Sequence, residues 1–265
     1  MSPISTSEPP PLPERASPVP APTPTRSLLR AVFLDVLLAF VALFVASILL
    51  GVPVLVAEAL RVSGGDIAGV DFEALQHDVM PQLTAASVFA TLLAALATWW
   101  ARSRRLPVLA AMRAHAAYPL AIVSGALIQL ACLGISVLSA HAGVPIEPSN
   151  VDPLQELDEA TPWLFWLVVV VVAPAAEELL FRHVLLRRFA VAGRALLGVA
   201  VTSLLFALLH EPVPTGASWL VAVALYTAMG AGFSAVYLRT GRLGAAIAAH
   251  ATCNLVALSL AFSGA

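Results

Sequence analysis

Hydrophobic residues gather in seven long stretches that short polar segments separate. We place the stretches at 31–57, 83–101, 118–140, 163–187, 194–210, 218–238 and 243–262. A helix needs about 20 predominantly apolar residues to cross the hydrocarbon core of a bilayer. Because each stretch is close to that length, the pattern predicts an all-α fold, a polytopic transmembrane bundle of about seven helices.

The composition supports the membrane class. Of 265 residues, 60% are hydrophobic and only 11% are charged, whereas soluble domains are about 45–50% apolar and about 25% charged. Both cysteines, Cys132 and Cys253, lie inside apolar stretches. We expect them to be packing residues and not a disulfide or a metal-binding pair.

The chain begins with a segment of different character. Residues 1–26 are rich in Pro, Ser and Thr and contain few large apolar side chains. Such a segment cannot bury enough surface to offset the entropy of ordering it. We therefore predict a disordered cytoplasmic tail at 1–26, followed by N-terminal transmembrane helices over 27–150.

The placement of the arginines predicts the orientation. With the N-terminus in the cytoplasm, eleven arginines fall on the cytoplasmic side, the outer loops contain only Arg61, and most acidic residues fall outside. Arginine and lysine are enriched in cytoplasmic loops. We expect a multi-pass protein of the cell (inner or plasma) membrane. The inner set is Arg26, Arg30, Arg102, Arg104, Arg105, Arg113, Arg187, Arg188, Arg194, Arg239 and Arg242.

Six polar residues on three of the predicted membrane spans are candidates for function. They are Glu177, Glu178 and Arg182 in the fourth span, His210 at the end of the fifth, and His250 and Asn254 in the seventh. An ionised side chain at the bilayer centre costs about 2.5 kcal/mol or more, so such residues are rare and usually functional. Residues four apart share a helix face, so Glu178 can meet Arg182, and His250 and Asn254 can point the same way.

This set of residues suits hydrolysis of an amide or ester by activated water. We assign Glu178 to the pair with Arg182 and leave Glu177 as a general base beside a like charge. A histidine that faces the base can orient the water, and His250 and Asn254 can donate to an oxygen that gains negative charge. Pro174, one turn earlier, should loosen the helix and help water to enter.

The span limits given above place Glu177 and His210 at different depths in the membrane. At about 1.5 Å per residue, His210 lies roughly 24 Å above Arg194, but Glu177 lies only about 16 Å above Arg188. The two side chains meet only if the helices tilt or if the cytoplasmic limits of the spans are wrong. We expect the limits to be wrong.

The same residues resemble a known family. The patterns EExxxR at 177–182, FxxxH at 206–210 and HxxxN at 250–254 are similar, in order and on successive spans, to the motifs of the CPBP family. That family comprises intramembrane glutamic endopeptidases, including CAAX prenyl proteases and bacteriocin-processing or immunity proteins. The resemblance covers about residues 160–260 and predicts a CPBP-like catalytic membrane domain at 151–265.

The resemblance also implies roles for the residues. Glu177 looks like the catalytic base, with His210 helping it to activate water. Glu178 and Arg182 resemble the supporting charges, and His250 and Asn254 resemble an oxyanion-stabilising pair. It implies no cofactor, metal-independent catalysis, and a peptide or membrane-associated protein substrate, possibly lipidated. We expect no nucleic-acid partner. His183 stands where the family often has glycine.

Other interpretations stay open at this point. Glu177, His210 and His250 could be three ligands of a catalytic zinc, which would make the protein a membrane metallopeptidase. The carboxylates could also serve a transporter or a non-catalytic scaffold. In purely structural terms, the charges could be an ion cluster, His210 an interfacial residue, and Asn254 an interhelical hydrogen-bond donor.

Overall fold

The computed structural model describes residues 25–65, 70–146, 148–149 and 151–263. The expected disordered tail lies outside the described residues up to position 24, and Thr25 already belongs to the first helix. Within the described ranges the secondary structure is helical and there is no strand. The predicted all-α membrane bundle is confirmed.

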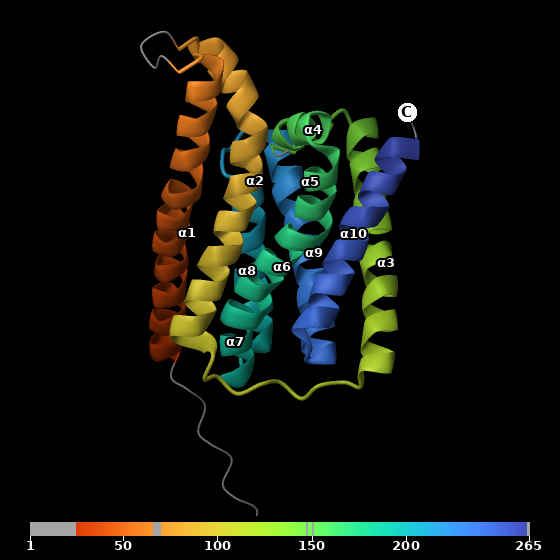
Figure 1. Ribbon diagram of the computed structural model, residues 1–265. Coiled ribbons are helices and arrows are strands. Elements are labelled where there is room, and N and C mark those ends of the chain that lie inside the picture. Colours follow the sequence, from red (N-terminus) through yellow and green to blue (C-terminus); the bar gives the residue numbers. More distant parts are fainter. Residues whose placement is uncertain (1–24, 66–69, 147, 150, 264–265) are drawn as a thin grey trace, which may run out of the picture.

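The helices stand side by side and connect through short segments (Figure 1). Six of them, the broken helix Pro162–Val191 included, are long and apolar enough to cross a membrane, whereas α8 has only 16 residues. The elements are α1 (Thr25–Val62), α2 (Phe72–Thr98) with its π-helical end η2 (Trp99–Ser103), α3 (Ala114–His141), α4 (Val151–Ala160), α8 (Ala195–His210), α9 (Ala217–Thr240) and α10 (Leu243–Ser263).

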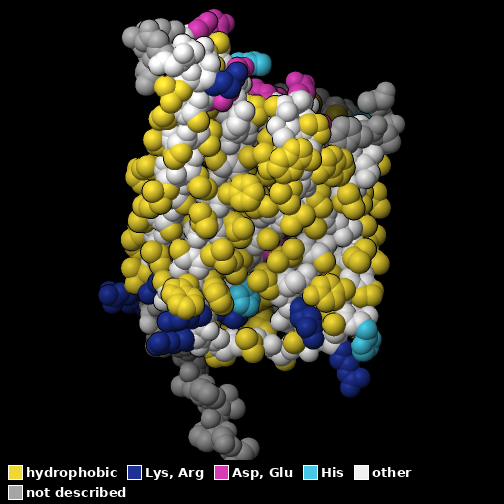
Figure 2. All heavy atoms as spheres, in the orientation of Figure 1, with side chains coloured by type: hydrophobic (Ala, Val, Ile, Leu, Met, Phe, Trp, Pro, Cys, Tyr) yellow, Lys and Arg dark blue, Asp and Glu magenta, His cyan; other side chains and the backbone are white. Residues whose placement is uncertain are grey.

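The two ends of the bundle carry opposite charge. In Figure 2 a hydrophobic band covers the middle of the molecule, arginines gather at the lower end, and acidic side chains gather at the upper end. This separation agrees with the arginine distribution along the sequence. It is the pattern expected of a membrane protein whose arginine end faces the cytoplasm.

The helix that carries the two glutamates is irregular. It runs from Pro162 to Val191 through α5 (Pro162–Leu167), η3 (Val168–Val172), α6 (Ala173–Glu177), η4 (Glu178–Leu186) and α7 (Arg187–Val191). The η segments are π-helical: the amide of Ala173, for example, donates to the carbonyl of Val168, five residues back. Single π turns inside α-helices are frequent at functional sites. The loosening predicted around Pro174 is therefore present.

The span limit near residue 187 was wrong, as the heights of the motifs indicated. The helix continues to Val191 before the chain turns at Gly193, whose φ is 74°. At about 1.5 Å per residue, Glu177 lies roughly 21 Å from Val191 and His210 roughly 22 Å from Ala195. The two motif residues therefore stand at the same height, on either side of one tight turn.

Glycine lets α8 and α9 approach closely beside the motif helix. A Cβ atom added at Gly230 of α9 would stand 3.0 Å from the Cα atom of Ser203 in α8. Small residues at such crossings are typical of membrane helix packing. The close approach brings α9 to the edge of the site.

A buried aspartate ties the first helix to the motif helix. Asp35 of α1 is fully buried, and its carboxylate accepts hydrogen bonds from Arg102 and from Arg188. The two arginines come from η2 and α7, so one carboxylate joins three helices at the arginine end. The apolar packing of α1 against α2 and of Val32 and Leu28 against the motif helix complements this contact.

The acidic segment after α3, one of the polar segments between the predicted spans, forms helix α4 (Val151–Ala160). Its acidic residues face outward, while Leu157 is 1% exposed and packs with Ala85 and Phe165. The helix lies across the acidic end of the bundle (Figure 1). It packs against α2 and α5 and shields one corner of the core.

Candidate active site

Glu178 forms the centre of a buried ion cluster. Its side chain has no exposed area, and its Oε1 atom lies 3.0 Å from Nη1 of Arg182 and 3.0 Å from Nδ1 of His250. The contact with Arg182 was predicted from the spacing of four residues. The contact with His250 joins the fourth and seventh predicted spans through one oxygen atom.

Arg182 also contacts a backbone carbonyl and aromatic rings. Its Nη2 atom donates a hydrogen bond of 2.9 Å to the carbonyl of Gly230, and its side chain is 1% exposed. The guanidinium carbon lies 5.0 Å from the ring centroid of Phe206 and 5.4 Å from that of Phe233. A cation among aromatic faces and one carboxylate is well compensated for its loss of water.

Glu177 has a different environment from its neighbour. Its Oε2 atom lies 3.7 Å from Nε2 of His210 and 3.9 Å from Nε2 of His250. These separations exceed direct hydrogen bonds, and Oε2 has no hydrogen-bond partner among the described residues. The carboxylate oxygen therefore faces two imidazoles without being engaged by either.

The partners of the two histidines fix which nitrogen faces Glu177. Nδ1 of His210 lies 2.8 Å from the carbonyl oxygen of Phe206, and Nδ1 of His250 contacts the carboxylate of Glu178. Both partners accept hydrogen bonds, so each Nδ1 carries the proton. In the neutral imidazole the Nε2 atom is then an acceptor, like the carboxylate oxygen it faces. A water molecule has two hydrogens and suits such a pair of acceptors.

Asn254 contacts the backbone of the broken helix. Its Nδ2 atom donates a 2.9 Å hydrogen bond to the carbonyl of Val169. In the π-helical register of η3, residue 174 would donate to this carbonyl, but Pro174 has no N–H. The amide of Asn254 takes the place of that donor. A second amide hydrogen of Asn254 remains for another acceptor.

Aromatic rings enclose the two histidines. The ring of His210 contacts those of Phe206, at 4.3 Å between centroids, and Tyr226, at 4.6 Å. The ring of His250 stacks on Phe233 at 4.4 Å with an interplanar angle of 17°. Sequence analysis missed Tyr226 and Phe233. Their spacing of seven residues, two turns of one helix, is the signal that places them on one face of α9.

The loop after α3 is attached to the end of α8. The hydroxyl of Ser149 donates to the carbonyl of His210 at 2.6 Å, and the amide of Ser149 donates to the carboxylate of Glu211 at 3.1 Å. Trp219 donates from its indole nitrogen to the carbonyl of Glu211. Sequence analysis missed these contacts as well. These contacts fix the end of α8, where His210 lies, from the acidic side of the bundle.

Two further residues can be placed. His183, which stands where the CPBP motif often has glycine, contacts the hydroxyl of Tyr237 through Nδ1 at 3.0 Å. Cys132 and Cys253 are both buried free thiols. Among the residues that the structure describes, no group of three His, Cys, Asp or Glu side chains is arranged to hold a metal ion.

Comparisons with known proteins agree with the motifs. Residues 159–256 match a family model described as type II CAAX prenyl endopeptidase, Rce1-like, and all six predicted site residues lie in this range. No curated protein and no solved structure matches the chain significantly. The match makes residues 159–256 an Rce1-like domain of the CPBP family, the family of the CAAX proteases.

Proposed function

We propose that this protein is an intramembrane endopeptidase that hydrolyses a peptide bond with water activated by Glu177 and His210. The family of residues 159–256 supports the protease class. The observation that carries the mechanism is the environment of Glu177. Its Oε2 atom lies 3.7 and 3.9 Å from two imidazole nitrogens, whereas Oε1 of the neighbouring Glu178 contacts both Arg182 and His250 at 3.0 Å.

In the proposed reaction Glu177 takes a proton from water that His210 orients. The water oxygen attacks the carbonyl carbon, and the electron pair of the C=O bond moves to the oxygen. Asn254, through its second amide hydrogen, and His250, with a proton on Nε2 as well as on Nδ1, are proposed to stabilise that oxyanion. The proton on Glu177 then passes to the amide nitrogen, the C–N bond breaks, and an acid and an amine result.

Glu178 and Arg182 support this chemistry without taking a proton. Glu178 accepts from Nδ1 of His250 at 3.0 Å and so fixes the direction in which that ring presents Nε2. Arg182 balances the charge of Glu178 inside the membrane. A buried carboxylate without such a partner would cost several kcal/mol.

The substrate is proposed to be a peptide or protein segment close to the membrane, with or without a lipid tail. A prenylated tail is what the family's name describes. Leader-peptide processing, bacteriocin processing and immunity belong to the same class of reaction. An N-terminus in the cytoplasm is part of the same proposal and rests on the arginine distribution.

The test is cleavage of a panel of fluorogenic peptides, with and without lipid tails, by the purified protein in detergent. Wild type is compared with Glu177→Gln and with Glu156→Gln, a matched control that removes an exposed carboxylate of α4. We expect cleavage by wild type and by Glu156→Gln, and a loss of at least about 100-fold in Glu177→Gln. Equal cleavage by all three proteins contradicts the proposal.

A zinc-dependent mechanism is the second candidate. Both histidines have Nδ1 tied to an acceptor, a pattern that is also common at metal-ligating histidines. If a chelator abolishes cleavage and added zinc restores it, the mechanism is not water activation by Glu177 but a metal centre held by Glu177, His210 and His250. Transport that persists in Glu177→Gln, with no peptide cut by wild type, would instead favour a transporter.

A further inference from the structure

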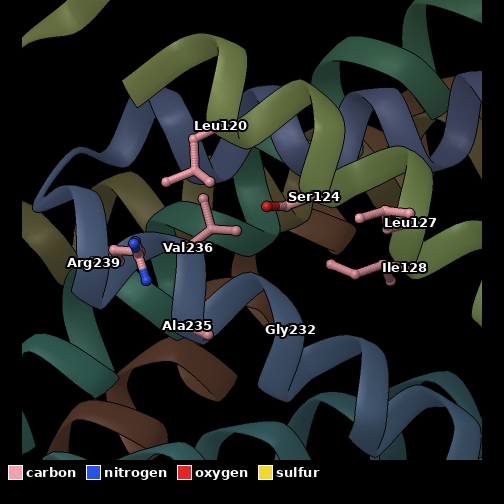
Figure 3. Close-up of a pocket in the computed structure, with 8 residues that line it drawn as sticks. All are labelled: Leu120, Ser124, Leu127, Ile128, Gly232, Ala235, Val236 and Arg239. Atoms are coloured by element: carbon pink, nitrogen blue, oxygen red, sulfur yellow. The ribbon is translucent and has the colours of Figure 1, made fainter. Parts of the chain in front are cut away.

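A groove opens between α3 and α9, and none of the six predicted site residues lines it. Figure 3 shows its lining: Leu120, Ser124 and Ile128 come from α3, and Gly232, Ala235 and Arg239 come from α9. Its volume is about 340 Å³. With the exception of Ser124 and Arg239, the lining side chains are apolar.

The shape of the groove follows from small residues. At Gly232 the two helices touch, because an added Cβ atom would lie 2.7 Å from the Cδ1 atom of Ile128. Toward the arginine end, Ser124 and Ala235 fill little of the space between the helices. From Leu120 to Ile128 the groove covers roughly 12 Å along the helix axis. That length suits part of an extended acyl chain.

Arg239 stands at the end of this groove, one residue before α9 ends at Thr240. Its side chain is exposed, and in the described part of the chain it has no acidic partner, unlike Arg102 and Arg188, which share Asp35. Nearby Arg242 is also engaged, because it donates to the carbonyl of Met112. A cation without a carboxylate partner therefore lies where lipid headgroups meet the protein.

We propose that this groove is a binding site for an anionic phospholipid, whose phosphate group contacts Arg239 and whose acyl chain lies between α3 and α9. The lipid tails of the bilayer are as apolar as the groove. An acyl chain that moves into the groove therefore gains van der Waals contacts but little hydrophobic free energy. Selectivity must then come from the headgroup. Basic pockets between transmembrane helices are a recognised way of binding anionic headgroups. The site does not depend on the proposed proteolysis.

The experiment measures binding of phosphatidylglycerol and of phosphatidylcholine with the same acyl chains to the purified full chain, by native mass spectrometry from detergent. We expect phosphatidylglycerol to bind at least about tenfold more tightly, and Arg239→Gln to remove most of that preference. Arg105→Gln, which changes an exposed arginine in the segment between η2 and α3, should leave the preference intact. Inorganic phosphate at the same concentration should not compete with phosphatidylglycerol, because it has no acyl chain to occupy the groove.

A second variant tests where the acyl chain of the lipid lies. Ala235→Phe fills the groove without removing charge, so it should weaken the binding of both lipids, while Arg239→Gln should weaken mainly the anionic one. Circular dichroism checks that each variant keeps its helical content. Equal affinity of wild type for the two lipids, or an equal loss in Arg105→Gln and Arg239→Gln, overturns the proposal. So does phosphatidylglycerol affinity that Ala235→Phe leaves unchanged.

Discussion

Replacement of each glutamate by glutamine should have very different effects on stability. Glu178 is fully buried, and its Oε1 atom contacts both Arg182 and His250 at 3.0 Å. Glutamine keeps the volume but removes the charge, so Arg182, 1% exposed, becomes a buried cation without its carboxylate partner. Removing one partner of a buried ion pair lowers the free energy of unfolding by about 3–5 kcal/mol. We expect Glu178→Gln to lower the free energy of unfolding by this amount.

Glu177 provides the matched control within the same helix. Its side chain is 17% exposed, and its nearest imidazole nitrogens are 3.7 and 3.9 Å away, beyond direct hydrogen bonds. Glu177→Gln removes the same charge one residue earlier. Because no direct partner loses its contact, we expect the free energy of unfolding to change by less than about 1 kcal/mol.

The assay is equilibrium unfolding in mixed micelles with increasing sodium dodecyl sulfate, followed by circular dichroism or tryptophan fluorescence. Adding Arg182→Gln to Glu178→Gln completes a double-mutant cycle. The double variant should be more stable than the sum of the single changes predicts, by about 2–3 kcal/mol. If Glu178→Gln and Glu177→Gln unfold within about 1 kcal/mol of each other, the division of the two glutamates into a supporting and a reactive group is refuted.

Changes at three more positions test the contacts around the site and at the arginine end. Tyr226→Phe should keep kcat near wild type, whereas Tyr226→Leu, which removes the ring stacked on His210, should lower kcat by about 2- to 12-fold in peptide cleavage, the equivalent of one aromatic pair. Asn254→Leu leaves the Val169 carbonyl without its donor and should lower the free energy of unfolding by about 1–3 kcal/mol, measured in mixed micelles; no loss would show that the bond is unimportant. Asp35→Asn should increase proteolytic cutting near the arginine end by loosening α1, and unchanged protection would contradict its role as a tie between helices.

The place of the membrane helices could be predicted because the bilayer imposes a length on each apolar stretch, although α8, one of the seven predicted spans, is shorter than that length. The prediction located the broken helix correctly, and the mismatch in height between Glu177 and His210 pointed to its true end at Val191. The helix α4 was missed because acidic residues dominate its composition. Its place depends on the burial of Leu157 against other helices, which no local pattern of the segment reveals.

The candidate site was predictable where contacts lie within one helix. A spacing of four residues was enough to pair Glu178 with Arg182. Contacts between helices were harder, because they depend on helix rotation and on the π-helical register. The bond from Asn254 to Val169 needs that register, and the stacking of Tyr226 on His210 needs the close approach of α8 and α9. Catalytic roles for these residues stay predictions until activity is measured.

The most direct test of the account is the rate of peptide hydrolysis by wild type and by Glu177→Gln, on the best substrate of the panel and with chelator in both samples. Mixed-micelle unfolding first establishes that the two proteins are equally stable. We predict that wild type keeps its full rate in chelator and that Glu177→Gln loses at least about 100-fold in kcat. A Glu177→Gln protein that cleaves at the wild-type rate, or a wild type that chelator silences and zinc restores, would contradict it.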